Sequence, residues 1–314
     1  MKLIKRVFYI TILQIIIPYC SFAGNGTPDI TETVNKDSII RFGIIADIQY
    51  CNCDRAGSRY YRNSLTKLDE CIDKLNEEKV QFTINLGDLV DRDTPCNLDS
   101  VLSRLCKLNN TAYNLTGNHD YGNIQDNEQL YKRLNMPGQY YSFRRGNWCF
   151  IMLNTNEVAP YANVENTEKE AELTDMLQKI KEEKRSNGAG YNGGISKKQM
   201  QWLEQELKKS QRNSINTLIF SHHPLYGING LTALNDLEII DLLSKYSATV
   251  KGVISGHHHA GAFGFYKDIP FITVEGMVET EAINAYGIVT IYPDKVELKG
   301  TGRTKSRTIL LNRN

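Results

Sequence analysis

The sequence predicts an α/β domain built around a mixed β-sheet. Short apolar runs rich in β-branched and aromatic residues alternate with longer segments whose apolar residues recur at helical spacing, which is typical of this class. Near the carboxyl end, residues 286–292 and 295–299 flank Pro293-Asp294 and predict two strands joined by a turn. No linker interrupts the chain, so we expect a single domain over residues 24–314.

The first 23 residues predict an export signal that is removed by cleavage. A basic start ending at Arg6 precedes an apolar stretch, residues 7–17, and the small-x-small pattern Ser21-Phe22-Ala23. The apolar stretch is shorter than the ~20 residues that a membrane-spanning helix needs. We therefore expect an exported protein, periplasmic or secreted, and Cys20 leaves a lipoprotein signal open as an alternative.

The composition argues against a nucleic-acid or membrane-surface partner. The chain has 37 Lys+Arg and 36 Asp+Glu, which gives a net charge of +1. No stretch after residue 24 is apolar enough to span a bilayer. Six of the seven cysteines follow the signal, an even number that suits an oxidising compartment but leaves their pairing open. Cys51 and Cys53 are close together, yet a single CxC pair is weak support for zinc.

Taken in order along the chain, the predicted internal strands are residues 39–46, 80–86, 111–115, 148–153, 217–220 and 250–255. An apolar stripe from Leu65 to Leu75 predicts one helix, and a second stripe runs from Met200 to Leu207. The pattern Ser196-x-x-Gln199 begins the second helix as a capping box. The polar segment 157–194 is predicted to be a partly helical insertion over the active-site edge.

Metal-binding residue types follow five of these strands, and they include all six histidines of the chain. They are Asp47 and Gln49, Asp88, Asn118 and His119, His222 and His223, and His257 to His259. Ligands of open α/β sheets bind outside the carboxyl ends of the strands, so these side chains should converge on one crevice. A single Asp or Asn in such a turn is more often a turn former, and a lone His-rich turn can be plain surface. The joint clustering favours a metal site.

These motifs, in this order, resemble those of the calcineurin-like metallophosphoesterases. They are D-x-[HQ] at 47–49, G-D at 87–88, G-N-H-[DE] at 117–120, H-x-P at 222–224 and G-H-x-H at 256–259. The resemblance covers residues 42–292. It implies a four-layer α-β-β-α sandwich of two mixed sheets, with a dinuclear metal centre between the strand ends.

The resemblance also implies roles for individual residues. Asp47, Gln49 and His259 would hold one metal, Asn118, His222 and His257 would hold the other, and Asp88 would bridge the two. His119 would face the substrate. His258 lies between His257 and His259, so its side chain should point to the opposite face and not bind a metal. His223 would be a neighbour of the site.

The segment after Asp88 resembles the protein-phosphatase version of the G-D motif. Asp91 would then orient His119, and Arg92 would bind phosphate. Asp93 stands where that family has glycine, which puts the role of Arg92 in doubt. The alternative for Asp91 and Arg92 is a surface ion pair worth at most ~1 kcal/mol.

Several stretches outside the metal motifs are similar to the manganese-dependent ADP-ribose/CDP-alcohol diphosphatases. They are 59–64, 191–196, 274–280, 292–295 and 298–303, and Gln49 belongs to that subfamily as well. The similarity suggests that Arg59, Arg62, Asn192, Gly193 and Gly194 bind the substrate. An ordinary turn at 192–194 and a plain first helical turn at 59–62 are the alternatives.

The expected function is hydrolysis of the pyrophosphate bond in nucleoside diphosphate derivatives such as ADP-ribose and CDP-choline. Two cations can clamp the attacking and leaving oxygens of an in-line displacement and lower the pKa of bound water. The oxygen and imidazole donors suit Mn, Fe or Zn, and the amide oxygen of Gln49 favours Mn²⁺. A phosphomonoesterase or cyclic phosphodiesterase with the same centre is the alternative. A non-catalytic binding domain would be expected to have lost ligands, and none is missing.

Overall fold

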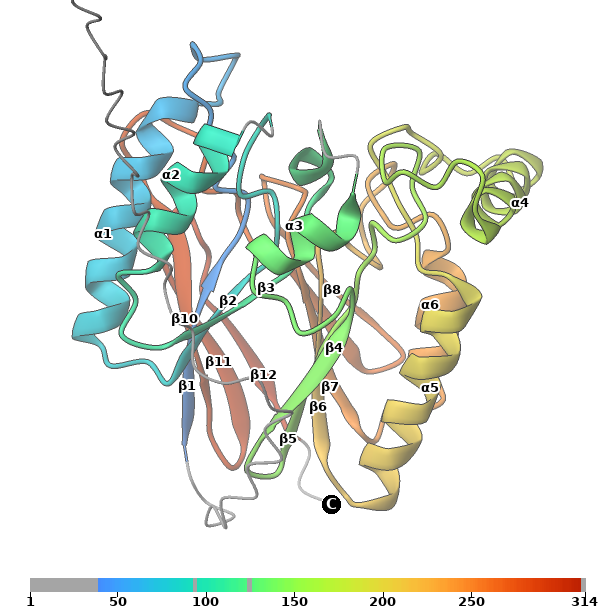
Figure 1. Cartoon of the computed structure of the whole chain (residues 1–314). Coiled ribbons are helices and arrows are strands. Elements are labelled where there is room, and N and C mark those ends of the chain that lie inside the picture. Colours follow the sequence, from blue (N-terminus) through green and yellow to red (C-terminus); the bar gives the residue numbers. More distant parts are fainter. Residues whose placement is uncertain (1–38, 93–94, 123–125, 312–314) are drawn as a thin grey trace, which may run out of the picture.

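A computed structural model describes residues 39–92, 95–122 and 126–311 (Figure 1). The predicted export signal with Cys20, and Asp93, lie outside these residues. Two six-stranded sheets pack face to face, with helices α1 and α2 outside one sheet and α5 and α6 outside the other (Figure 1). The four-layer α-β-β-α sandwich of two mixed sheets is thereby confirmed.

The first sheet has the strand order β12-β11-β10-β1-β2-β3. Its strands are β1 (Ile40–Ile45), β2 (Phe82–Asn85), β3 (Thr111–Asn114), β10 (Ala285–Ile291), β11 (Lys295–Gly302) and β12 (Arg307–Leu310). β1, β2 and β3 are parallel, and β10 pairs antiparallel with β1 and with β11. The predicted pair of strands at the carboxyl end is therefore present and makes this sheet mixed.

The second sheet has the strand order β4-β5-β6-β7-β9-β8. Its strands are β4 (Tyr141–Arg145), β5 (Trp148–Met152), β6 (Asn216–Ser221), β7 (Val250–Ser255), β8 (Ala262–Tyr266) and β9 (Ile269–Thr273). β5, β6, β7 and β9 run parallel, and β4 and β8 are antiparallel edge strands. β4, β8, β9 and β12 were not predicted. Three of them are edge strands, and β9 contains Pro270, which weakens its strand signal.

Four phenylalanines join the two sheets beneath the strand ends. Phe42 and Phe82 come from the first sheet, Phe150 and Phe220 from the second, and all four are fully buried. The rings of Phe42 and Phe82 stack at 4.9 Å, and Phe150 meets Phe42 edge-on at 5.7 Å. Burial of each ring stabilises the fold by about 1.5–3 kcal/mol, so this cluster fixes one sheet relative to the other.

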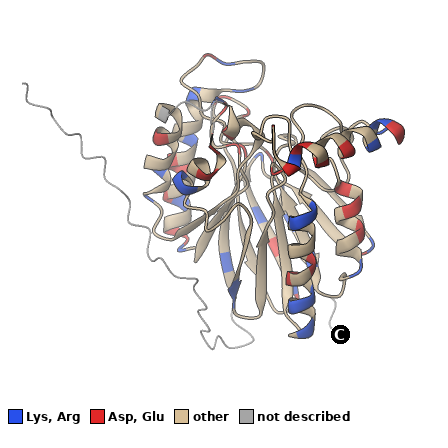
Figure 2. Cartoon of the chain, turned by 45° about the vertical axis from the view of Figure 1, so that its right-hand side comes forward, with Lys and Arg blue, Asp and Glu red and all other residues tan. Residues whose placement is uncertain are grey.

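The outer helices are α1 (Ser64–Glu77), α2 (Pro95–Leu105), α3 (Asn127–Arg133), α4 (Glu168–Glu182), α5 (Lys197–Arg212) and α6 (Asp236–Ser244). The predicted apolar stripes of α1 and α5 face the core, with Leu65 and Met200 partly buried and the other members fully buried, as expected for amphipathic helices. Charged residues of both signs line the outer helices, and the strands between them are largely uncharged (Figure 2). Within the described part of the chain, every helix is too short or too polar to cross a bilayer.

The start of α5 differs from the predicted capping box. Ser196 caps the helix by accepting a hydrogen bond from the N–H of Gln199 at 3.1 Å. The amide of Gln199, however, donates to the carboxylate of Glu157 at 2.6 Å and does not reach back to Ser196. Glu157 instead accepts the N–H of Ser196 at 3.0 Å. A buried carboxylate following β5 therefore completes the cap, and it ties that strand end to α5.

Candidate metal centre

The carboxyl ends of five strands bring all the predicted metal ligands together. β1 leads to Asp47 and Gln49, and β2 leads to Asp88. After β3, the short 3-10 helix η2 (Asn118–Tyr121) begins with Asn118. In the second sheet, β6 is followed by His222 and β7 by His257 and His259. The donor atoms of Asp47, Asp88 and His259 lie within 4.8 Å of one another, and those of His222 and His257 belong to a second such cluster.

The second cluster is organised by the ring of His222. Its Nδ1 lies 2.9 Å from the carbonyl oxygen of Leu86. A carbonyl oxygen only accepts, so Nδ1 carries the proton and Nε2 presents a lone pair. That Nε2 lies 3.1 Å from Asn118 Oδ1 and 3.2 Å from His257 Nδ1. His222 therefore offers its free nitrogen to the same point as two other donors.

The tautomer of His257 follows from Asn192. The amide nitrogen of Asn192 donates to the carbonyls of Asn187 and Gly230, so its Oδ1 faces His257 Nε2 at 3.3 Å. Nε2 of His257 must then carry the proton, and its Nδ1 lone pair faces that of His222. Burial and the neighbouring histidines lower the pKa of His257, which keeps the ring neutral. The lone pairs of His222 Nε2 and His257 Nδ1 and the amide oxygen of Asn118 therefore converge with no proton between them, which is an arrangement that suits a cation.

In the first cluster, Glu279 orients the ring of His259. His259 Nδ1 lies 2.7 Å from Glu279 Oε1 and therefore donates to it, which leaves Nε2 free at 3.5 Å from Asp47 Oδ1. Burial lowers the pKa of His259, but Asp47 and Glu279 outweigh burial and raise it to about 9. A proton therefore competes with a metal for this nitrogen, and metal binding should weaken as the pH falls.

Gln49 and Asp88 supply the remaining donors. The Gln49 side chain is buried, and its Oε1 has no hydrogen-bond partner among the described residues. A buried oxygen without a donor is costly unless a cation satisfies it, so Gln49 fits a metal ligand. Asp88 Oδ2 lies 2.9 Å from Gln49 Nε2 and 3.5 Å from His222 Nε2. Asp88 thus stands between the two clusters, as a bridging ligand must.

The ligands are held in a strained backbone conformation. Asp47, Gln49, Asp88 and His257 have φ angles of 52°, 42°, 53° and 67°, in the left-handed region that L-residues rarely adopt. Each such residue costs about 1–3 kcal/mol. Two backbone hydrogen bonds help offset this cost, from Asp47 N to Gly87 O at 3.2 Å and from Gln49 N to Asp88 O at 2.8 Å. The fold therefore imposes the positions of these ligands.

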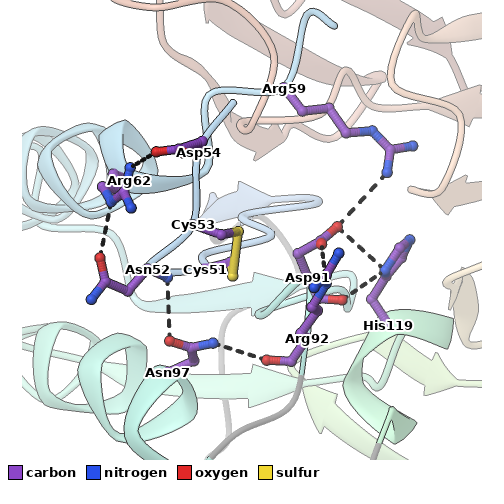
Figure 3. Close-up of a disulfide and its surroundings, with 10 residues drawn as sticks. All are labelled: Cys51, Asn52, Cys53, Asp54, Arg59, Arg62, Asp91, Arg92, Asn97 and His119. Carbon is purple, nitrogen blue, oxygen red and sulfur yellow. Dashed lines mark hydrogen bonds and ion pairs between the residues drawn. A yellow bond between two sulfur atoms is a disulfide. The ribbon is translucent and has the colours of Figure 1, made fainter. Parts of the chain in front are cut away.

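His119 adjoins the first cluster, because its N–H donates to Asp88 Oδ1 at 2.9 Å, and its ring faces Asp91, which Arg59 approaches (Figure 3). His119 Nδ1 lies 2.9 Å from the carbonyl oxygen of Asp91 and 3.4 Å from its Oδ1, so this nitrogen donates and Nε2 stays available. The Arg59 Nη1 lies 3.8 Å from Asp91 Oδ1. Asp91 N donates to Tyr50 O at 3.1 Å, which links it to the strand end that carries Gln49. The hydrogen bond to His119 thus comes from the backbone of Asp91, and an orienting role of its carboxylate stays a prediction.

The other two arginines predicted to bind substrate do not point at the centre. Arg62 donates to Asn52 and Asp54, on the far side of a disulfide from Asp91 and His119 (Figure 3). Its guanidinium is held in an exposed ion pair with Asp54, so substrate binding by Arg62 stays a prediction. The Arg92 side chain is 76% exposed and reaches only Asp91 Oδ2, at 3.9 Å, as in the surface alternative. Arg59 is the predicted arginine that reaches the site.

A disulfide joins Cys51 to Cys53 next to the site (Figure 3). It removes the zinc alternative for this CxC pair, because both sulfurs are used. Cys71, Cys96 and Cys149 are free thiols, so the even number of cysteines did not mean that all of them pair.

The segment 192–194 is held by contacts within the protein, and Asn192 contacts His257. All the hydrogen-bonding atoms of the Asn192 side chain are used within the protein, as described above. A Cβ at Gly193 would lie 2.4 Å from Thr155 O, so this residue packs against the strand end. Gly194 N donates to Val158 O at 2.9 Å and is not available to a phosphate. The structure thus gives Asn192 a role in orienting His257, while substrate binding by residues 192–194 stays a prediction.

His223 is a neighbour of the centre, as predicted, although its ring lies with the second cluster. Its Nε2 donates to Tyr191 O at 3.1 Å, and its Nδ1 lies 2.9 Å from Thr155 Oγ1. Both ring nitrogens have hydrogen-bond partners, and burial lowers the pKa of His223 to about 3. The ring is therefore neutral and holds Tyr191 and Thr155 in place. His258 lies outside both clusters.

Sequence reasoning gave no role to Glu279, Thr155 or Lys67. Glu279 lies in the stretch 274–280, and Thr155 follows the predicted strand 148–153, so each had a signal nearby. Lys67 lies on the buried face of α1. Its ammonium group donates to the carbonyl oxygens of Met277, Glu279 and Thr280. It thereby fixes the loop that holds Glu279 against His259. No local pattern marks such a long-range contact.

Comparison with known proteins agrees with this geometry. Residues 40–261 match the calcineurin-like phosphoesterase family. The manganese-dependent ADP-ribose/CDP-alcohol diphosphatase of Arabidopsis thaliana is 28% identical over 309 residues, which cover 86% of this chain and 97% of that protein. The Homo sapiens protein of the same name is 26% identical over 322 residues, with coverage of 87% and 93%.

The crystal structure of a dimetal phosphatase from Danio rerio has the same fold. It aligns with a TM-score of 0.80 and 26% sequence identity, over 87% of this chain and 99% of that chain. The family match extends over more than half of the chain and includes every strand end that carries a predicted ligand. The chain belongs to the calcineurin-like phosphoesterase family.

Proposed function

We propose that this metallophosphoesterase hydrolyses the pyrophosphate bond of nucleoside diphosphate derivatives, with ADP-ribose and CDP-alcohols as its substrate class. The observation that carries the proposal is Asp88, whose carboxylate stands between two clusters of donors. The substrate class rests on the relatives named above, which align over nearly their whole length.

The residues of the site would have separate roles in metal binding, proton transfer and phosphate binding. Asp47, Gln49 and His259 would hold one divalent ion, Asn118, His222 and His257 the other, and Asp88 both. Two ions held by these residues would supply positive charge to the phosphoryl oxygens and would lower the pKa of the attacking water. His119, held by Asp91, presents Nε2 for proton transfer or charge stabilisation. Arg59 adds a positive charge beside His119, suited to a second phosphate.

A parallel assay tests the substrate class. ADP-ribose, CDP-choline, p-nitrophenyl phosphate and a nucleoside 2′,3′-cyclic phosphate are compared with added Mn²⁺. We expect the highest kcat/KM on the two pyrophosphates, with the nucleoside monophosphate as a product. A higher value on the monoester or on the cyclic phosphate would replace the proposal by the corresponding phosphatase or phosphodiesterase activity.

The metal preference can be tested at Gln49. Its amide oxygen is a harder donor than imidazole, so it favours Mn²⁺ over softer ions. We expect Gln49→His to raise activity with Zn²⁺ or Co²⁺ relative to activity with Mn²⁺, measured with each ion on the metal-depleted enzyme. An unchanged order of metals would show that other residues set the preference.

We also propose that the mature protein works outside the cytoplasm. The basic and apolar stretches before Ala23 support this location. Mass spectrometry of the purified natural protein should find an amino terminus near Gly24, in the periplasmic or secreted fraction. A lipidated peptide beginning at Cys20 would place the protein on a membrane surface instead.

A further inference from the structure

The disulfide between Cys51 and Cys53 closes a tight turn, residues 51–53, which we call the disulfide turn (Figure 3). Cys51 is buried and packs with Tyr61 and Val278. Cys53 is only partly buried, which leaves its end of the bond the more accessible to a reagent. The two cysteines are two positions apart, and a cross-link stabilises a fold less when it closes a shorter loop. Global stability is therefore a weak reason for this bond, and its place next to the site points to a local role.

The disulfide turn holds the neighbouring backbone at two points. On one side, Asp91 N donates to the carbonyl oxygen of Tyr50, the residue directly before the turn, at 3.1 Å. On the other side, the N–H of Asn52, within the turn, donates to Asn97 Oδ1 at 3.4 Å. The amide nitrogen of Asn97 in turn donates to the carbonyl oxygen of Arg92 at 3.0 Å (Figure 3). The turn thus restrains two consecutive residues of the loop that follows β2.

The loop restrained in this way holds the ring of His119. Nδ1 of His119 lies 2.9 Å from the backbone carbonyl oxygen of Asp91, and this contact leaves Nε2 available for the reaction. A shift of that carbonyl would therefore turn the ring and displace Nε2. The metal ligand Gln49 has a separate restraint, because its own N–H donates to Asp88 O at 2.8 Å. The disulfide turn can thus affect His119 without releasing a metal ligand.

We propose that Cys51 and Cys53 are positioning residues, whose disulfide sets the ring of His119 through the backbone of Asp91. The inference rests on the proposed function, in which His119 Nε2 takes part in the reaction. The oxidised protein is then the fully active form, and opening the bond slows turnover while the metals stay bound. An oxidising compartment, which the predicted export would provide, keeps the bond closed.

A dithiol opens the bond in two exchange steps. A thiolate of the dithiol attacks Cys53 Sγ, which forms a mixed disulfide and releases Cys51 as a thiolate. The second sulfur of the dithiol then displaces Cys53 and closes a disulfide within the reagent. Two electrons pass from the dithiol to the two cysteines, and each cysteine takes up one of the two protons that the dithiol loses. The covalent restraint on the disulfide turn is then gone.

Reduction of the native protein is the first test. The enzyme is treated with dithiothreitol without denaturant, separated from the reagent under nitrogen, and assayed with Mn²⁺ on the substrate for which His119→Ala loses most activity. We expect kcat to fall by about 10- to 100-fold, because a displacement of about 1 Å can cost about 10²-fold in rate. KM and metal content should stay near those of the oxidised enzyme, and oxidised glutathione should restore kcat.

Three results of this test would overturn the proposal. One is an unchanged kcat once alkylation and mass spectrometry show that Cys51 and Cys53 are both reduced. Another is loss of metal on reduction, because the turn would then act on a ligand. The third is a kcat that does not return on reoxidation, because the reduced protein would then have unfolded.

Variants locate the effect among the cysteines. The double variant Cys51→Ser with Cys53→Ser should have the kcat of the reduced enzyme and should not respond to dithiothreitol. Cys96→Ser is the matched control, because it removes an exposed free thiol from α2 and should leave both kcat and the response to dithiothreitol unchanged. A double variant that still responds would place the effect at another cysteine and reject the proposal.

A cycle with His119→Ala separates positioning from a general structural effect. Without the ring, reduction should leave kcat unchanged, because the group that the disulfide positions is absent. The same fold loss as in the wild type would show that the disulfide acts by another route, and would reject the proposal. A loss that requires His119, in an enzyme that does not cleave ADP-ribose, would retain the role of the disulfide and reject the substrate class.

Discussion

Replacing Asp88 with alanine should abolish measurable turnover and deplete both metals. Asp88 is the one carboxylate placed between the two donor clusters, so its loss removes a ligand from each. Each ion contributes several kcal/mol of charge stabilisation in the transition state, so we expect kcat to fall by at least about 10³-fold. Elemental analysis of the purified variant and steady-state kinetics with added Mn²⁺ measure the two effects.

Two further variants show whether a loss of metal and activity in Asp88→Ala comes from misfolding. Asp88→Asn keeps an oxygen that can accept the N–H of His119, a bond of 2.9 Å in the native protein, but it lacks the negative charge that bridges two cations. Asp99→Ala removes an exposed aspartate paired with Arg133 and should leave metal content and activity unchanged. Full occupancy of two metals in both Asp88 variants would reject the assignment of Asp88 as the bridge.

Replacing His119 with alanine should leave both metals in place and slow the chemistry. The His119 ring binds Asp91 through Nδ1 and belongs to neither donor cluster, so metal binding does not require it. A general acid contributes about 10²–10⁴-fold in rate. An alkoxide leaving group needs a proton far more than the phosphate released from a pyrophosphate. The fall in kcat should therefore be larger on alkyl phosphodiesters than on ADP-ribose.

The ratio of these two losses distinguishes two roles for His119. If the ring mainly stabilises charge on the transferred phosphoryl group, both substrates should lose the same factor. Equal losses with intact metal content would therefore reject the general-acid role. His258→Ala is the control, since this neighbouring histidine lies outside both clusters and should have little effect. Loss of metal in His119→Ala would instead make His119 a ligand.

The convergence of the candidate ligands was predictable because each of them follows closely after a strand. A strand fixes the direction of the next few residues, and the carboxyl ends of parallel strands share one edge of the sheet. Asp47 and His257, at the ends of β1 and β7, could therefore be placed together from sequence, although they are 210 residues apart. The pair of strands β10 and β11 at the carboxyl end and the apolar faces of α1 and α5 were likewise predictable from local patterns.

The contacts that orient the ligands were not predictable, because they depend on side chains from distant loops. Glu279 meets His259 from a loop whose carbonyl oxygens accept hydrogen bonds from Lys67, and neither contact leaves a periodic signal. The partners of the Asn192 side chain, including the carbonyl of Gly230, could not be foreseen either. The ion pair between Arg62 and Asp54 could not be foreseen from the sequence either.

The two sheets contribute to each donor cluster together. Asp47, Gln49 and Asp88 follow strands of the first sheet and meet His259 from the second. Asn118 from the first sheet likewise meets His222 and His257 from the second. Each ion would thus act as a cross-link between the two halves of the sandwich, so that opening the sandwich and releasing the ions become one event. Metal present at 100 times its dissociation constant would then add about 2.7 kcal/mol per site to the free energy of unfolding.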